Sequence, residues 1–128
     1  MRGMADPRHT LGRLAEESAA RFLERAGLRI VARNVRFRAG EIDLVCRAGA
    51  RWVFVEVKAR QARWGDAPGA AVEWWKQRRL VRLAQLYLRS RGLGDAPCRF
   101  DVVAVTIDDA GAARIRHFPS AFDASGMV

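Results

Sequence analysis

The sequence predicts an α/β fold in which a mixed β-sheet is flanked by helices. Helical periodicity is confined to residues 11–26 and 70–91, and five short segments rich in β-branched and aromatic residues lie between and after them. The order is therefore α-β-β-β-α-β-β, which favours one sheet with helices packed on it. At 128 residues the chain suits one domain. We place this domain at residues 10–119, with flexible termini at residues 1–9 and 120–128.

The first helix is expected at residues 11–26. Its apolar or small side chains recur at i, i+3, i+4 spacing at positions 11, 14, 15, 18, 22 and 26. Thr10 can cap the start of this helix and Gly27 can end it. Glu16 lies at the border of the apolar stripe, whereas Glu17 lies further around, toward solvent.

Three strands are expected before the second helix, at residues 29–37, 41–47 and 52–60, and two after it, at 99–107 and 113–118. Asn34 interrupts the first of these strands. A loop at residues 61–69 leads into the long helix, residues 70–91, whose apolar arc includes positions 72, 80, 83, 84 and 87. Lys76 falls near the centre of that arc and Arg79 near its edge. A lysine in this position either snorkels past its neighbours or points at an anion.

The charge of the chain indicates a polyanionic partner. There are 23 basic residues against 14 acidic ones, a net charge of +9, and such an excess attracts nucleic acid phosphates. The alternative is an arginine-biased composition, since all the cations except Lys58 and Lys76 are arginines.

No apolar run approaches the roughly 18 residues needed to span a bilayer, and no hydrophobic signal segment follows the N-terminus. Together with two cysteines that lack ligand spacing, these features predict a cytoplasmic protein without a membrane partner.

The hairpin formed by residues 41–47 and 52–60 has a predictable register. Pairing residues whose numbers sum to 99 sets the apolar positions 42, 44 and 46 opposite 57, 55 and 53, which gives one buried face. The other face then sets Asp43 directly across from Glu56, and Glu41 across from Lys58.

This face predicts a metal site. Two directly opposed carboxylates destabilise a sheet, and an unpaired buried charge is costly. Lys58 supplies one compensating charge, because it lies two residues beyond Glu56 on the same strand. A divalent cation between Asp43 and Glu56 would supply the rest, and Mg²⁺ and Mn²⁺ prefer such hard oxygen ligands. The alternative is an exposed strand face that carries an ordinary ion pair.

Two segments of the hairpin resemble those of a known family. Gly-Glu-Ile-Asp-Leu-Val at residues 40–45 and Val-Phe-Val-Glu-Val-Lys-Ala-Arg at 53–60 are similar to the signature of the YraN-like family of small uncharacterised bacterial proteins. Segments 12–16, 33–34, 76–79 and 99–103 extend the resemblance over about residues 10–107, although Ala15 stands where the family pattern has a second glycine. The family is related to the restriction-endonuclease-like PD-(D/E)XK superfamily and to archaeal Holliday-junction resolvases.

The resemblance implies a restriction-endonuclease-like core with a nuclease site. Asp43 and Glu56 would hold Mg²⁺ or Mn²⁺, Lys58 would orient or activate the attacking water, and Glu16 would assist from the first helix. The reaction would be metal-assisted hydrolysis of phosphodiester bonds in nucleic acid, with DNA as the expected substrate. Accessory or nucleic-acid-binding roles would fall to Glu41, Arg60, Lys76 and Arg79.

Two other functions remain open. The chain could be a nucleic-acid-binding module that keeps the nuclease fold without turnover. The intact set of Asp43, Glu56 and Lys58 argues against this alternative, because a protein without turnover is free to lose those residues. The chain could also be a structural or interaction protein, and the sequence leaves a homodimer open.

Overall fold

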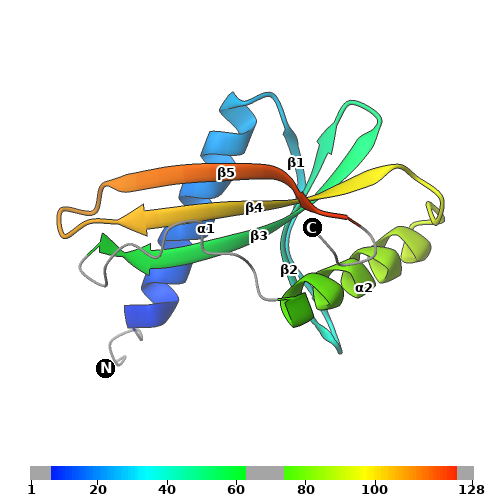
Figure 1. Ribbon diagram of the computed structural model, residues 1–128, viewed down its shortest axis with the longest axis horizontal. Helices are drawn as coiled ribbons and strands as arrows, with labels where there is room; N and C mark the ends of the chain where they lie inside the picture. The colour runs from blue at the N-terminus through cyan, green and yellow to red at the C-terminus, as the bar shows by residue number, and fades with distance from the viewer. Residues whose placement is uncertain (1–6, 63–73, 124–128) are drawn as a thin grey trace, which may run out of the picture.

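The computed structural model describes residues 7–62 and 74–123, and the order of its elements is the predicted one (Figure 1). The N-terminal half contains α1 (Pro7–Arg25), β1 (Arg29–Phe37), β2 (Gly40–Ala48) and β3 (Arg51–Gln61). The C-terminal half contains α2 (Trp74–Ser90), β4 (Cys98–Ile107) and β5 (Ala113–Phe122). The part of the predicted second helix before residue 74 lies outside the described residues.

The strands form a five-stranded sheet in the order β1-β2-β3-β4-β5. Three of the neighbouring pairs are antiparallel, and β3 and β4 are parallel. A parallel pair needs a long crossover connection, and α2 is part of that connection. The predicted α/β class with a mixed sheet is therefore confirmed.

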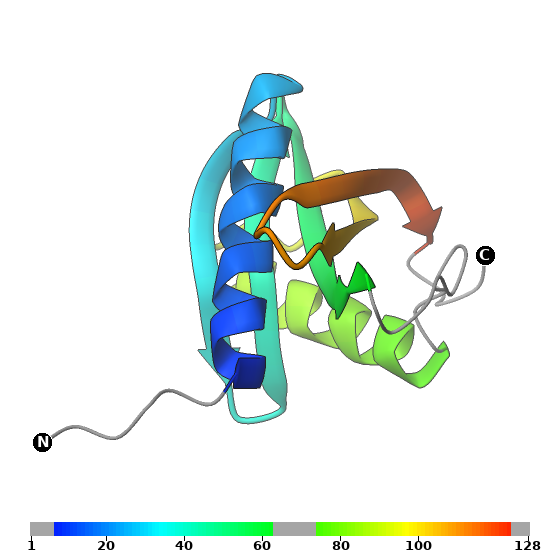
Figure 2. The ribbon, with the colours of Figure 1, turned by 90° about the vertical axis from the view of Figure 1, so that its left-hand side faces the viewer.

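Helices cover both faces of the sheet (Figure 2). On one face, Ala15, Ala19 and Leu23 of α1 belong to a core cluster with Val53 and Val55 of β3. On the other face, α2 contributes to a second cluster, formed with β2, β3 and β4, that includes Leu83, Tyr87, Val45, Phe54 and Phe100. The central strand β3 is thus buried on both faces over residues 52–55.

The first helix differs from its prediction at the start and in its buried face. It begins at Pro7, so Thr10 lies inside the helix and does not cap it. Leu14 is 49% exposed and Ala26 is exposed, whereas positions 11, 15, 19 and 23 are buried. The small side chains at 15 and 19 allow the helix to approach the sheet on that side, and the buried stripe is rotated toward Glu16. Gly27, with φ +98°, follows the helix end as predicted.

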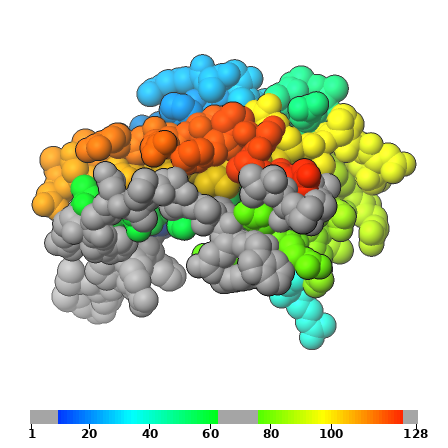
Figure 3. Space-filling model, viewed as in Figure 1, coloured from blue at the N-terminus to red at the C-terminus, as the bar shows by residue number. Residues whose placement is uncertain are grey.

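The last strand is longer than predicted. It continues to Phe122, whose ring stacks on Phe100 at a centroid distance of 5.2 Å, so residues 120–122 belong to the sheet and not to a flexible terminus. Pro119 is tolerated there because β5 is an edge strand. Figure 3 shows this strand running along the surface of the molecule.

A buried ion network fastens this edge strand to its neighbour. Asp101 of β4 has no exposed surface. Its carboxylate accepts hydrogen bonds from Arg99 Nε at 3.0 Å and from the Ser120 N–H at 3.0 Å, and it lies 2.8 Å from His117 Nε2.

Candidate metal centre

The β2–β3 hairpin has the predicted register over its outer part only. Residues whose numbers sum to 99 pair from Ala48–Arg51 to Leu44–Val55. Beyond Val55 the two strands diverge (Figure 1), and β3 continues to pair with β4 as far as Gln61. We call the diverging segments, residues 40–43 of β2 and 56–61 of β3, the fork. The predicted ladder pairs 42–57, 43–56 and 41–58 are therefore wrong.

Side chains replace the ladder inside the fork. The Val57 N–H, which points away from the β3–β4 ladder, donates a hydrogen bond of 2.8 Å to Asp43 Oδ2. Glu56 lies close enough to Asp43 to raise the pKa of that carboxyl group through hydrogen bonding and charge. Asp43 and Glu56 thus meet as neighbours, although their backbones do not pair.

At the fork, the side chains of β2 also change the face of the sheet on which they lie. Leu44 and Cys46 pack in the cluster under α1, but Ile42 packs in the cluster under α2. The prediction that all three share one face is wrong, because strict alternation is lost beside Asp43. On β1, Arg33 pairs with Leu44 and Val35 pairs with Ile42. Asn34, which lies between them, has a left-handed φ of +49°.

Three carboxylates converge at this point. One carboxylate oxygen from each of Glu16, Glu41 and Asp43 can be chosen so that all three lie within 4.8 Å of one another. Asn34 Nδ2 donates to Glu16 Oε1 at 3.0 Å and to Glu41 Oε2 at 3.1 Å. Glu41 also pairs with Arg36, at 3.0 Å, so the predicted position of Glu41 opposite Lys58 is wrong. We call Glu16, Glu41, Asp43 and Glu56 the carboxyl cluster.

The electrostatics of the cluster disfavour full ionisation. Burial, the hydrogen bond with Glu56 and the Glu56 charge raise the pKa of Asp43 to about 8, against the opposing effect of the Val57 N–H. Burial likewise raises the pKa of Glu16, with further contributions from Asp43 and Glu41, while the Asn34 amide opposes the shift. The carboxyl cluster therefore holds more negative charge than its protein neighbours compensate.

The donor set fits a hard divalent cation. Its ligand atoms are carboxylate oxygens, which Mg²⁺, Mn²⁺ and Ca²⁺ prefer to softer donors. A cation among them would offset the repulsion that raises the Asp43 pKa. Sequence reasoning selected Asp43, Glu56 and Glu16 for this region but placed Glu41 incorrectly.

The four predicted cationic residues lie on β3 and α2. Lys58 is half-buried on β3, two residues beyond Glu56 and therefore on the same face of the strand. Arg79 of α2 lies against Gly40, where an added Cβ would come within 3.3 Å of Arg79 Cδ. Lys76 of α2 and Arg60 of β3 are half-buried. The roles assigned to these four residues stay predictions.

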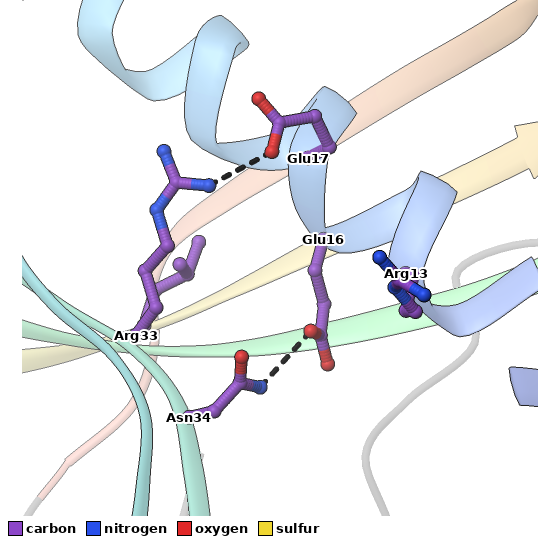
Figure 4. Close-up of a pocket in the computed structure, with 6 residues that line it drawn as sticks. Arg13, Glu16, Glu17, Arg33 and Asn34 are labelled. Carbon is purple, nitrogen blue, oxygen red and sulfur yellow. Dashed lines mark hydrogen bonds and ion pairs between the residues drawn. The ribbon is translucent and has the colours of Figure 1, made fainter. Parts of the chain in front are cut away.

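A small hollow lies beside the carboxyl cluster, between α1 and the first two strands (Figure 4). It has a volume of about 130 Å³ and is open to solvent. Glu17, which borders it, is held by Arg33 at 2.9 Å. Sequence reasoning missed Asn34, which also lines this hollow. An asparagine inside a strand, where it is disfavoured, was the available signal. The hollow's lining consists of Arg13, Glu16, Glu17, Arg33, Asn34 and Leu44.

The chain belongs to the family described as uncharacterised protein family UPF0102, whose model matches residues 15–105. This is the YraN-like family that the sequence resembles. A UPF0102 protein of Symbiobacterium thermophilum is 53% identical over 89% of this chain and 97% of its own. A UPF0102 protein of Pelotomaculum thermopropionicum is 46% identical over 93% of this chain and all of its own length.

One similar solved structure is that of Pyrococcus furiosus SfsA in complex with Ca²⁺. The TM-score is 0.44 at 15% sequence identity. The match covers 84% of this chain and 63% of the SfsA chain, which is less than two thirds of its length.

Among the described residues, neither helix has the length and apolar character required to cross a membrane.

The carboxyl cluster predicts an unusual pH dependence of stability. Between about pH 4 and 8, folded Asp43 retains a proton that the unfolded chain has lost. In EDTA the free energy of unfolding should therefore fall as pH rises through this window, by at most about 1.4 kcal/mol per pH unit for one group. Urea unfolding at several pH values measures this slope. Asp43→Asn should flatten it, and an equal slope in that variant would contradict the assignment.

Proposed function

We propose that this protein is a metal-dependent nuclease that hydrolyses phosphodiester bonds in DNA, with Mg²⁺ or Mn²⁺ as its cofactor. The observation that carries the proposal is the convergence of Glu16, Glu41 and Asp43, with Glu56 close to Asp43, in the fork between β2 and β3. The resemblance of this hairpin to the YraN-like family, which is related to the PD-(D/E)XK superfamily, supports the same activity.

Four residues of the fork and one residue of α1 have roles in this proposal. Asp43 and Glu56 would hold the cation, with Glu16 completing the set from α1. A bound divalent ion polarises a phosphoryl oxygen and lowers the pKa of a coordinated water. Lys58 is the nearest cation to Glu56 along β3, and its ammonium group would orient the attacking water and attract the scissile phosphate. The Val57 N–H fixes Asp43 Oδ2 and so orients that carboxylate.

The surface charge supports nucleic acid as the substrate. The net charge of +9 includes exposed arginines on α2, where Arg78, Arg82 and Arg89 face solvent. Arginine binds phosphate oxygens through a planar array of donors. The direct test of the function is cleavage of labelled DNA by pure protein in Mg²⁺ or Mn²⁺, which EDTA should abolish.

Binding to DNA should weaken steeply as salt rises, because each phosphate contact releases condensed counterions. In EDTA, which prevents turnover, we expect at least a 10-fold loss of affinity between 50 and 200 mM salt, on the order of that for a few phosphate contacts. Fluorescence anisotropy with duplexes of unrelated sequence measures this slope and the expected sequence tolerance. An affinity that stays constant over this range would count against nucleic acid and favour a protein partner.

A further inference from the structure

Asn34 combines a left-handed backbone in β1 with a side chain that contacts two glutamates. It lies in the middle of β1, in a strand interior where asparagine is disfavoured. Its φ of +49° is left-handed, a conformation that asparagine adopts more readily than most residues other than glycine. Such outliers persist where the surrounding structure stabilises them, and they gather at functional sites.

The side-chain amide of Asn34 joins two carboxylates from different elements. Its nitrogen carries two hydrogens. Nδ2 donates to Glu16 Oε1 of α1 at 3.0 Å and to Glu41 Oε2 of β2 at 3.1 Å. Figure 4 shows the Asn34 amide directed at Glu16. One residue of β1 thus fixes both glutamates whose oxygens lie within 4.8 Å of an oxygen of Asp43.

A neutral donor suits this position better than a cation. An arginine or lysine between the two glutamates would cancel their charge and compete with a bound metal ion. An amide satisfies one lone pair on each carboxylate, and a carboxylate oxygen retains further lone pairs for a second partner. Asn34 can therefore hold the glutamates close to Asp43 without adding a positive charge of its own, and the only cation paired with either glutamate among the described residues is the exposed Arg36, at 3.0 Å from Glu41.

We infer that Asn34 is a positioning residue of the proposed metal centre, which sets Glu16 and Glu41 at ligand distance from Asp43 before a cation binds. The inference rests on the proposed function, because it assumes that the carboxyl cluster binds a metal ion. Hydrogen-bonding partners that orient metal ligands typically change metal affinity by about 10–100-fold when they are removed.

Two variants separate the backbone of Asn34 from its amide. Asn34→Gly tolerates the left-handed backbone and removes the donor. Asn34→Asp keeps the shape and replaces the donor with another carboxylate. Ser120→Gly is the matched control, because Ser120 also has a left-handed φ, of +50°, but lies in β5 beside Asp101. All three proteins and the wild type are titrated with Mn²⁺ by calorimetry, and their melting temperatures are compared in EDTA and in Mn²⁺.

Relative to the wild type, the two Asn34 substitutions should change the response to Mn²⁺ in opposite directions. Asn34→Gly should bind Mn²⁺ about 10–100-fold more weakly, with a melting temperature in EDTA close to that of Ser120→Gly. Asn34→Asp should melt at a lower temperature than the wild type in EDTA, because a further carboxylate adds repulsion. Mn²⁺ should raise the melting temperature of Asn34→Asp by more than it raises that of the wild type.

Wild-type Mn²⁺ affinity in Asn34→Gly would overturn the inference about Asn34 and leave the proposed metal centre intact. Equal losses of melting temperature in both variants, with unchanged Mn²⁺ affinity, would reduce Asn34 to a structural link between α1 and the sheet. A wild type that binds no Mn²⁺ would overturn the metal centre itself, and the role of Asn34 with it.

Discussion

Replacing Glu56 by Gln or Lys58 by Met should abolish metal-dependent cleavage of DNA. The first change removes a negative charge from the proposed metal site, and the second removes the ammonium group while keeping most of the side-chain stem. A metal ligand supplies several kcal/mol of transition-state stabilisation, so we expect a loss of roughly 100–1,000-fold in the cleavage rate. Gel assays of end-labelled DNA under single-turnover conditions measure that rate.

Folding and binding should survive these changes. Glu56→Gln relieves repulsion with Asp43, so its stability in EDTA should equal or exceed that of the wild type. Its affinity for DNA should stay near the wild-type value. Glu24→Gln is a suitable control, because Glu24 is exposed on α1 and is not part of the carboxyl cluster. Cleavage that persists in both purified fork variants would locate the activity elsewhere or in a contaminant.

Among the substitutions proposed for this protein, Asp101→Ala should cause the largest decrease in the free energy of unfolding. The substitution leaves Arg99 and His117 without their carboxylate partner, and their side chains are only 22% and 14% exposed. Removing one member of a buried ion pair destabilises a protein by about 3–5 kcal/mol. Urea unfolding at neutral pH measures the change.

Asp109→Ala provides the comparison for this substitution, because Asp109 is exposed in the turn between β4 and β5. It should change the free energy of unfolding by less than about 0.5 kcal/mol. A loss in Asp101→Ala as small as that in Asp109→Ala would mean that the network does not hold β5 to the sheet.

The order of the elements was predictable because it depends on local periodicity. The outer hairpin was predictable for a related reason, since only one register sets Leu44 opposite Val55 and Cys46 opposite Val53. The fork was not predictable from alternation, because there the Val57 N–H bonds to the Asp43 side chain in place of the β2 backbone.

The contacts that sequence reasoning missed are made between residues distant in the chain. Glu16 reaches the carboxyl cluster because the side of α1 that is buried is rotated away from its most apolar side. The most apolar side includes Leu14, which is exposed. The hydrogen bond from Asn34 to Glu16 depends on where α1 packs. The Asp101 network depends on an irregularity in the β4–β5 pairing between Phe100 and Val102. None of these arrangements follows from residue spacing.

The most direct measurement of the proposed function uses the wild-type protein alone. Labelled linear, flapped and four-way-junction DNA, and an RNA of the same sequence, are incubated with pure protein in Mg²⁺, in Mn²⁺ and in EDTA. Cleavage of at least one DNA in the metal buffers and none in EDTA is the predicted result. If no substrate is cut in any buffer and neither metal raises the melting temperature, the nuclease proposal is contradicted, and a nucleic-acid-binding module without turnover becomes the better account.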